Sequence, residues 1–210
     1  TGELVASAII KAAKDTGMPE GVFSNLNSSG IEVGQQLVSH PKVKGVGFTG
    51  SINGGRALYD LAAKRDEPIP VFAEMGSINP VIITRKALEK RASEIASTYA
   101  GSITLGTGQF CTNPGLILTL ESDFASKFID ELGEKTANID SFCMLHPNIH
   151  SAFNKKGAEV IEQPETTLVT EYKGDVPQNY AKAKVVTAKG DAFLKNSKLH
   201  QEVFGPFSLV

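Results

Sequence analysis

The sequence predicts an α/β protein whose strands are mainly parallel. Helical and strand-like segments alternate from the start of the chain to about residue 75, which is the pattern of strands joined by crossover helices. A change follows near Gly76, after which a second set of strands and helices begins. Two α/β units joined near Gly76 are the simplest arrangement, so we expect domains over residues 1–75 and 76–210.

The segments of the first half have separate signals. Residues 3–15 are Ala-rich, with apolar residues at helical spacing, and the glycines of residues 17–21 end that helix. Residues 31–39 predict a second helix, which ends before Pro41 because proline disfavours helix in the residue before it. We further expect a short strand over residues 22–23, a strand over 43–48, a helix over 54–64 and a strand over 69–73.

The second half contains longer helices. Residues 80–83 are apolar and predict a strand, and residues 86–105 predict a long helix. A strand over residues 116–120 leads into the polar cluster 121–123, whose side chains suit the N-cap of a helix. The further expected elements are helices over 124–132 and 149–162 and strands over 167–171 and 184–187.

Charge and composition exclude several classes of protein. Lys and Arg number 21 and Asp and Glu number 23, a net charge of −2 that gives no support to nucleic-acid binding or to a basic membrane-surface protein. Apolar residues make up 41% of the chain, enough for a packed core, and no run of about 18 apolar residues is present to span a membrane. Two cysteines cannot form a disulfide framework, which fits a cytoplasmic protein.

The two ends of the sequence lead us to expect a piece of a longer protein. Position 1 is Thr rather than Met, and the residues that follow already have a helical pattern. The last four residues, Phe207–Val210, have the pattern of a strand.

The first candidate site is a glycine-rich segment before the third expected helix. Residues 45–50 match the G-x-G-x-x-G pattern by letter, but two of those glycines fall inside the expected strand, where the dinucleotide fingerprint does not place them. The loop is better placed over residues 50–55. Amides at the helix N-terminus, with the hydroxyls of Thr49 and Ser51, would suit a phosphate. An ordinary glycine-rich turn is the alternative that remains open.

Two further residues have the chemistry of a catalytic site. Cys111 lies in the polar, glycine-rich segment 106–115, which indicates a thiol presented by a loop, whereas Cys143 has apolar neighbours and is expected in the core. Glu74 ends an apolar strand, and ligands of parallel sheets bind beyond the carboxyl ends of strands, so it is a candidate general base. The open alternatives are a buried structural cysteine and a solvated strand-end glutamate.

The histidines do not predict a metal site. His146 and His150 lie four residues apart, but no third ligand falls at a suitable spacing. Pro147, which lies between them, is better explained as the first residue of a helix. The sequence also lacks the G-x-S-x-G elbow and the G-x-x-x-x-G-K-[ST] loop of two other enzyme classes.

The order of these signals is more specific than any one of them, and it resembles the aldehyde dehydrogenase superfamily. The residues around Cys111, from Thr104 to Gly115, are most similar to the α-ketoglutaric semialdehyde (2,5-dioxovalerate) dehydrogenase branch. Four blocks carry the resemblance in the family's order: Phe48-Thr49-Gly50-Ser51 with Gly55, Glu74-Met75-Gly76, Gln109-Phe110-Cys111, and Glu202-Val203-Phe204-Gly205-Pro206.

The resemblance implies a chemistry for two side chains. Cys111 matches the nucleophile, whose thiolate attacks an aldehyde carbon, so that loss of hydride leaves a thioester. Glu74 matches the general base that activates water to hydrolyse that thioester, and the N–H of Cys111 would donate to the oxyanion. The implied activity is the NAD- or NADP-dependent oxidation of an aldehyde, such as a semialdehyde, to a carboxylic acid.

The resemblance also implies a cofactor site and an aldehyde pocket. Ser51 matches a contact to the dinucleotide pyrophosphate, and Glu202 matches the residue that holds the nicotinamide ribose. Phe204 matches the ring near the nicotinamide, and Phe110 should line the aldehyde pocket. The residues that would shape the pyrophosphate loop are Thr49, Gly50 and Gly55.

The implied domains are incomplete at both ends. Residues 1–75 would be the second half of a dinucleotide-binding domain of the Rossmann-like type, and residues 76–210 would be a catalytic domain without its C-terminal part. The full-length protein would be a homodimer or homotetramer. Ser77 and Ile78 replace a glycine and a lysine of the family's usual block, and Gly106 replaces an asparagine.

Three other functions remain open at the level of the sequence. Coenzyme A rather than water could resolve the thioester, although Glu74 favours water. The chain could be an inactive fragment that serves only in folding or binding. A cysteine hydrolase is the weakest alternative, because no histidine lies near Cys111 in the sequence.

Overall fold

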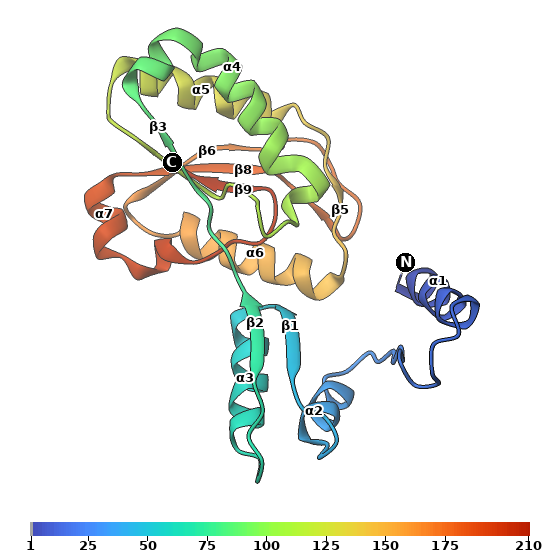
Figure 1. Ribbon diagram of the computed structural model, residues 1–210. Helices are drawn as coiled ribbons and strands as arrows, with labels where there is room; N and C mark the ends of the chain where they lie inside the picture. The colour runs from blue at the N-terminus through green and yellow to red at the C-terminus, as the bar shows by residue number, and fades with distance from the viewer. Residues whose placement is uncertain (1) are drawn as a thin grey trace. The chain divides into compact units, whose positions relative to one another are not determined.

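The computed structural model describes residues 2–210, which divide into two compact units between Met75 and Gly76 (Figure 1). Each unit contains both helices and parallel strands. The predicted α/β fold class is therefore confirmed, and each unit is described below by itself.

The first unit contains a two-stranded parallel sheet that is covered by a helix. Its elements are α1 (Gly2–Asp15), α2 (Glu32–Ser39), β1 (Val46–Gly50), α3 (Ile52–Ala63) and β2 (Val71–Met75). β1 and β2 pair in register from Val46 opposite Val71 to Gly50 opposite Met75. α3 is the crossover between them and packs on both strands. The parallel pair with its crossover helix is the arrangement that the alternating pattern predicts.

The strands of the first unit start later than the sequence predicts, and one expected strand is wrong. β2 begins after Pro70, which has no N–H to donate and contributes only its carbonyl, to Val46 N at 3.0 Å. β1 therefore begins at Val46 rather than at residue 43. Residues 22–23 pair with no strand among the described residues, and Val22 is 55% exposed.

The third helix begins earlier than predicted. Its first residue is Ile52, because Ser51 caps the helix by accepting a hydrogen bond from the Gly54 N–H. The expected loop over residues 50–55 is thus reduced to the junction between Gly50 and Ser51. The two glycines at positions 54 and 55 lie in the first turn of the helix.

The second unit is built on a five-stranded sheet in the order β3-β4-β9-β8-β6. Neighbouring strands are parallel except for β6, which is antiparallel to β8. The strands of this sheet are β3 (Pro80–Ile83), β4 (Leu116–Thr119), β6 (Thr166–Glu171), β8 (Lys184–Ala188) and β9 (Phe207–Leu209). A separate antiparallel pair is formed by β5 (Phe142–Cys143) and β7 (Tyr180–Ala181). The helices are α4 (Arg85–Thr104), α5 (Asp123–Ala137), α6 (Pro147–Ile161) and α7 (Gly190–Lys195), with short 3-10 helices η1 (Leu105–Gly108) and η2 (Ser197–His200).

Helices cover both faces of this sheet (Figure 1). α4 and α5 pack on one face, and α6 and η2 pack on the other. Strand β8, which lies between β9 and β6, shows the consequence. Val185 and Val186 are adjacent and both are fully buried, yet they belong to the two different hydrophobic clusters, because successive side chains of a strand point to opposite faces.

Most elements of the second unit are where the sequence predicts them, with three differences. α5 extends to Ala137 rather than to residue 132, because Phe128, Leu132 and Thr136 continue its buried stripe at four-residue spacing. α4 is interrupted at Arg91, where φ is −142° and the backbone leaves the helical region. β5, β7 and α7 are short elements that the sequence pattern did not indicate.

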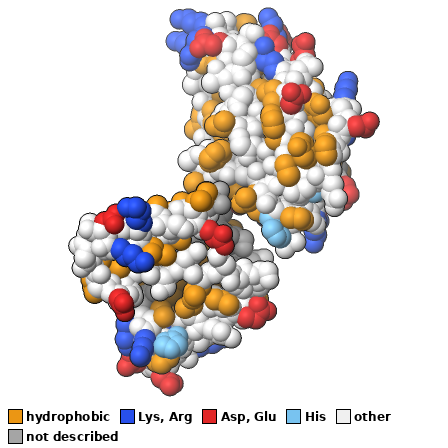
Figure 2. All heavy atoms as spheres, turned by 90° about the vertical axis from the view of Figure 1, so that its right-hand side faces the viewer, with side chains coloured by type: hydrophobic (Ala, Val, Ile, Leu, Met, Phe, Trp, Pro, Cys, Tyr) orange, Lys and Arg blue, Asp and Glu red, His pale blue; other side chains and the backbone are white. Residues whose placement is uncertain are grey.

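The surface carries mixed charge. On the face shown in Figure 2, acidic and basic side chains lie beside one another and alternate with exposed hydrophobic side chains. Within residues 2–210, none of the helices combines the length and the apolar character that crossing a membrane requires.

Candidate active site

In the first unit, the expected phosphate-binding residues lie where β1 ends and α3 begins. Thr49 and Gly50 are the last two residues of β1, and Ser51 is the N-cap of α3. The Ser51 hydroxyl accepts a hydrogen bond of 3.1 Å from the Gly54 N–H. A serine here stabilises the start of the helix, and the first-turn amides make this end attractive to an anion.

Gly55 lies within α3, where the helix approaches the sheet closely. A Cβ at this position would lie 2.4 Å from the Met75 side chain and 3.2 Å from Cδ1 of Phe48. Only glycine allows the helix to pack at this distance. Gly55 therefore determines how the N-terminal end of α3 sits on the strands.

Glu74 lies at the same edge of the first unit. It is the fourth residue of β2, pairs with Thr49 in the parallel register, and has an exposed side chain. Parallel strands end at a common edge, so Glu74 and the N-terminus of α3 both lie near that edge of the two-stranded sheet.

In the second unit, Cys111 lies on a tight turn. The carbonyl of Phe110 accepts a hydrogen bond of 3.0 Å from the Asn113 N–H, which makes Cys111 and Thr112 the central residues of a four-residue turn. The thiol of Cys111 is free and exposed. The alternative of a buried structural cysteine is therefore excluded.

The segment before this turn has an uncommon backbone conformation. Gly106, Thr107 and Gly108 have φ values of 55°, 59° and 65°. The left-handed region is costly for a β-branched residue such as Thr107, which is held there by burial. This step redirects the chain from the end of α4 into the turn. The ring of Phe110 lies over Gly106, where a Cβ would be 2.6 Å from Cε2, and is 48% exposed.

Gln109 joins the start of the turn to two other backbone segments. Its Nε2 donates to the Gly106 carbonyl at 3.0 Å, and its Oε1 accepts from the Leu145 N–H at 2.9 Å. The residue before the turn is thus fixed from both sides.

Glu202 is held from its side chain and from its backbone. Its Oε1 accepts a hydrogen bond of 3.1 Å from the Ser77 N–H, and its carbonyl accepts one of 3.0 Å from Lys156 Nζ. The side chain is half-buried. One carboxylate oxygen is therefore oriented by the protein, which leaves the other available to a ligand.

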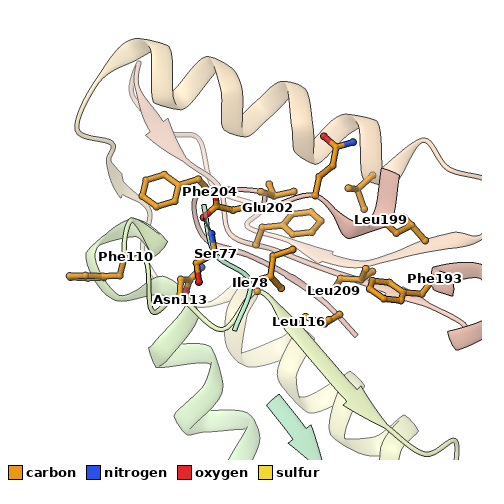
Figure 3. Close-up of a pocket in the computed structure, with 15 residues that line it drawn as sticks. Ser77, Ile78, Phe110, Asn113, Leu116, Phe193, Leu199, Glu202, Phe204 and Leu209 are labelled. Carbon is orange, nitrogen blue, oxygen red and sulfur yellow. Dashed lines mark hydrogen bonds between the residues drawn. The ribbon is translucent and has the colours of Figure 1, made fainter. Parts of the chain in front are cut away.

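A small pocket that is partly open to solvent lies beside Glu202 (Figure 3). Phe110, Asn113, Phe204 and Ser77 contribute to its lining. Figure 3 shows Ser77 and Asn113 close to Glu202, while the ring of Phe110 points away from them. In the second unit, Phe110, Glu202 and Phe204 therefore contribute to the lining of one pocket.

The Cys111 segment (residues 106–115) and the Glu202 segment (residues 202–206) are in contact at Gly108 and Gly205. A Cβ on Gly108 would lie 2.3 Å from the carbonyl carbon and oxygen of Gly205. Gly108 also has a positive φ, so both its conformation and its surroundings require glycine. The two segments are packed backbone against backbone.

A buried tyrosine lies under both segments. The hydroxyl of Tyr99, on α4, donates to the Pro114 carbonyl and lies 2.8 Å from Oγ of Ser208 on β9. Tyr99 is 5% exposed, and Ser208 is fully buried. Burial raises the pKa of the Tyr99 hydroxyl above its ordinary range, and the hydrogen bond with Ser208 opposes part of that rise.

The second cysteine differs from its prediction. Cys143 is exposed rather than in the core, because β5 is a two-residue strand that, within residues 2–210, pairs with β7 alone. Its Sγ accepts a hydrogen bond of 3.5 Å from Asn179 Nδ2. The hydrophobic neighbours in the sequence are divided, since Met144 is buried and Phe142 is 56% exposed.

The two histidines make hydrogen bonds that account for their positions. Nδ1 of His146 caps α6 by accepting from the Asn148 N–H at 3.1 Å, and Pro147 is the first residue of that helix. Nε2 of His150 lies 3.1 Å from the Tyr180 carbonyl. In the part of the chain that the structure describes, no group of three His, Cys, Asp or Glu side chains could hold a metal ion.

Sequence reasoning missed several polar residues that contact the site. Asn79 and Tyr99 hydrogen-bond to the Cys111 segment, the side chain of Asn113 donates from that segment to the Gly205 carbonyl, and Ser77 binds Glu202 through its backbone. The sequence offered a signal only for Asn113, which lies within the polar segment of Cys111. The other contacts join residues far apart in the chain, so no local pattern marks them.

Comparison with known proteins gives the family. The model of the aldehyde dehydrogenase family matches residues 1–210. The α-ketoglutaric semialdehyde dehydrogenase 2 of Azospirillum brasilense is 41% identical over 210 residues, which are 100% of this chain and 40% of that protein. The α-ketoglutaric semialdehyde dehydrogenase of Acinetobacter baylyi is 37% identical over 213 residues, again 100% of this chain and 40% of that protein. The chain thus spans about two fifths of the length of these curated relatives.

A solved structure agrees at the level of the fold. The NAD-dependent benzaldehyde dehydrogenase from Corynebacterium glutamicum superposes with a TM-score of 0.76 and 22% identity, over 95% of this chain and 43% of that one. The fold, the family match and the two relatives confirm the resemblance carried by the four sequence blocks. The chain belongs to the aldehyde dehydrogenase family.

Proposed function

We propose that the full-length protein that carries this chain oxidises an aldehyde to a carboxylic acid, with NAD or NADP as the hydride acceptor. The observation that carries the proposal is the exposed Cys111 thiol on a turn whose backbone is tied at both ends. A nucleophile must be accessible and also held in one place, because a misplacement of about 1 Å can lower a rate by about 100-fold. The first unit is then the second half of a dinucleotide-binding domain, and the second unit is most of the catalytic domain.

The chain's own residues account for the chemical steps. The Cys111 thiolate forms a carbon–sulfur bond with the aldehyde carbon, and the carbonyl oxygen becomes an oxyanion that the Cys111 N–H stabilises. A nicotinamide cofactor held by the N-terminus of α3 and by Glu202 would supply the hydride acceptor for that carbon. The carboxylate of Glu74 takes a proton from a water molecule, which attacks the remaining thioester, so that the carbon–sulfur bond breaks and the acid is released.

The residues present fit a dinucleotide. Helix geometry leaves the N–H groups of Ile52 and Asn53 without acceptors inside α3, and this end of a 12-residue helix attracts a pyrophosphate. Glu202 has one oxygen fixed by Ser77 N and a second that can accept hydrogen bonds from ribose hydroxyls. Phe204 lines the pocket beside it and offers a flat apolar surface to the nicotinamide.

The substrate that we propose is a semialdehyde of the α-ketoglutaric type. The support is that two relatives at 41% and 37% identity, each matched by the whole of this chain, carry that name. The Thr104–Gly115 segment around the nucleophile also resembles that branch.

The test compares the two exposed cysteines in the full-length protein. Cys111→Ser should lower kcat by at least about 1000-fold, since it removes the nucleophile. Cys143→Ser is the matched control, because Cys143 is also exposed but lies on a separate strand pair. The assay follows the formation of reduced cofactor with α-ketoglutaric semialdehyde by the absorbance of the reduced nicotinamide.

A second variant tests the hydrolytic step. Glu74→Gln should allow the first hydride transfer but slow release of the acid, so that intact-mass measurement shows an enzyme heavier by one acyl group. Unchanged turnover in Cys111→Ser would overturn the proposal. Acyl-coenzyme A as the main product when coenzyme A is added would replace water with that thiol as the acceptor.

A further inference from the structure

The turn that carries Cys111 is fastened to the second unit by one asparagine side chain. Nδ2 of Asn79 donates to the Cys111 carbonyl at 2.8 Å and to the Asn113 carbonyl at 3.1 Å. A carboxamide NH2 has two hydrogens, so one Asn79 side chain satisfies both acceptors. Asn79 immediately precedes β3, whose first residue is Pro80, so it projects from the end of a rigid strand.

A second asparagine extends this connection to the Glu202 segment. Nδ2 of Asn113 donates to the Gly205 carbonyl at 3.0 Å, while its backbone N–H closes the turn on Phe110. Its Oδ1 is buried and has no hydrogen-bond partner among residues 2–210. Figure 3 shows this side chain at the pocket, close to Glu202. Side-chain hydrogen bonds therefore run from Asn79 through Asn113 to the segment that follows Glu202.

We propose that Asn79 is a positioning residue for the nucleophile, and that Asn113 relays its constraint to the Glu202 segment. The inference rests on the proposed function, in which the Cys111 carbon–sulfur adduct must face a hydride acceptor held near Glu202. Asn79 reaches the reaction only through the backbone of the turn. Its two bonds fix the carbonyls of Cys111 and Asn113, which sets the direction of the Cys111 side chain relative to the pocket.

The two central residues of the turn, Cys111 and Thr112, make little hydrophobic contact that could fix their orientation. Cys111 and Thr112 are both exposed, so hydrophobic packing contributes little to their placement. Without Asn79, the Phe110–Asn113 hydrogen bond still closes the turn and Asn113 still binds the Gly205 carbonyl, but the Cys111 carbonyl loses the side-chain donor that orients it. The expected loss is therefore in the rate of the reaction and not in the affinity for either substrate.

The experiment replaces Asn79 by Ala in the full-length protein and uses Asn138→Ala as the matched control. Nδ2 of Asn138 also donates to a backbone carbonyl, that of Glu134 at 2.8 Å, but at the end of α5. We expect Asn79→Ala to lower kcat by about 10- to 100-fold, with both KM values within about threefold of wild type. Asn138→Ala should leave kcat and both KM values unchanged. Asn79→Ser, which keeps one donor, should recover part of the lost rate.

Two measurements separate positioning from a merely structural role. The rate of reduced-cofactor formation in the first turnover should fall with kcat in Asn79→Ala, while the thermal midpoint changes no more than in Asn138→Ala. The inference is overturned if kcat of Asn79→Ala stays within about twofold of Asn138→Ala, or if KM rises in proportion to the loss of kcat/KM. If Asn79→Ala does not fold, Asn79→Ser is measured in the same way, and a kcat equal to that of wild type overturns the inference. If Cys111→Ser loses activity but Asn79→Ala keeps the kcat of wild type, this inference is wrong and the proposed function stands. If Cys111→Ser remains active, the proposed function is wrong.

Discussion

Removing the Tyr99 hydroxyl should destabilise the second unit, because the Pro114 carbonyl and the Ser208 hydroxyl would each lose a hydrogen-bond partner. Tyr99 has one proton, which goes to the Pro114 carbonyl, so the Ser208 hydroxyl donates to Tyr99. Phenylalanine has the same shape without the oxygen and leaves almost no cavity. The effect of Tyr99→Phe is therefore that of two lost hydrogen bonds.

The magnitude follows from the burial of those two groups. Leaving a buried polar group unsatisfied costs about 1–3 kcal/mol. The Ser208 hydroxyl is fully buried, so its penalty lies at the upper end of that range. The Pro114 carbonyl is only partly buried, so its penalty lies at the lower end. The expected loss in the free energy of unfolding is about 2–4 kcal/mol.

The assay is urea unfolding of the full-length protein followed by circular dichroism at helical wavelengths. With a slope of about 2 kcal/mol per molar urea, the midpoint should fall by about 1–2 M. Tyr59→Phe is the control, because Tyr59 is 49% exposed and its replacement should change the free energy of unfolding by less than about 0.5 kcal/mol.

A double-mutant cycle decides whether the mechanism is right. If the penalty comes from an orphaned Ser208 hydroxyl, adding Ser208→Ala to Tyr99→Phe should recover about 1 kcal/mol or more. Additive losses in the double variant would refute the reasoning, as would a loss of under about 0.5 kcal/mol in Tyr99→Phe.

Three further predictions concern the same elements. Because burial raises the pKa of Tyr99 above its unfolded value, its contribution to stability is complete below about pH 10 and is lost progressively as pH rises above that value; the stability difference between wild type and Tyr99→Phe should therefore be constant below about pH 9 and shrink as pH rises above about 10 in urea titrations. Gly108→Ala combines a left-handed backbone with a contact of 2.3 Å to the Gly205 carbonyl, so it should lower the free energy of unfolding by about 2–5 kcal/mol, and a thermal midpoint equal to that of wild type would contradict the contact. Ser51→Ala and Ser122→Ala each remove an N-cap hydroxyl and should each cost about 1 kcal/mol, but only Ser51→Ala should weaken cofactor binding measured by calorimetry; equal affinities in the two variants would argue against a pyrophosphate at α3.

Much of the architecture could be predicted from the sequence, because its signals are local. Helix starts are marked by their own residues, as at Ser122 and Pro147, and apolar spacing indicates which segments are helices. The first and last residues of the strands were harder to predict, because they depend on the strand with which each one pairs. Pro70 delays both β1 and β2, although it belongs to neither.

Some residues of the candidate site could likewise be predicted from the sequence, and others could not. Cys111, Glu202 and the α3 cap stand in short blocks with chemistry of their own, so the sequence could indicate them. The exposure of Cys143 could not be predicted, because its apolar neighbours in the sequence suggest a core position. In the described second unit, Cys143 is exposed because β5 forms a short pair with β7 that is separate from the five-stranded sheet.

The sequence by itself thus determined the fold class, the family and the short blocks that carry the proposed nucleophile and the proposed cofactor contacts, since each of these depends on contiguous residues. Only the tertiary structure decided that β9 inserts between β4 and β8, so that Leu209 pairs with Leu116 and Phe207 with Lys184. That insertion places the segment after Glu202 against the Cys111 turn. The pairing of β3 with β4, which sets Pro80 opposite Leu116, brings Asn79 to the carbonyl of Cys111, 32 residues away. Hydrogen bonds of this kind depend on how distant strands are ordered in a sheet, and no local pattern of residues specifies that order.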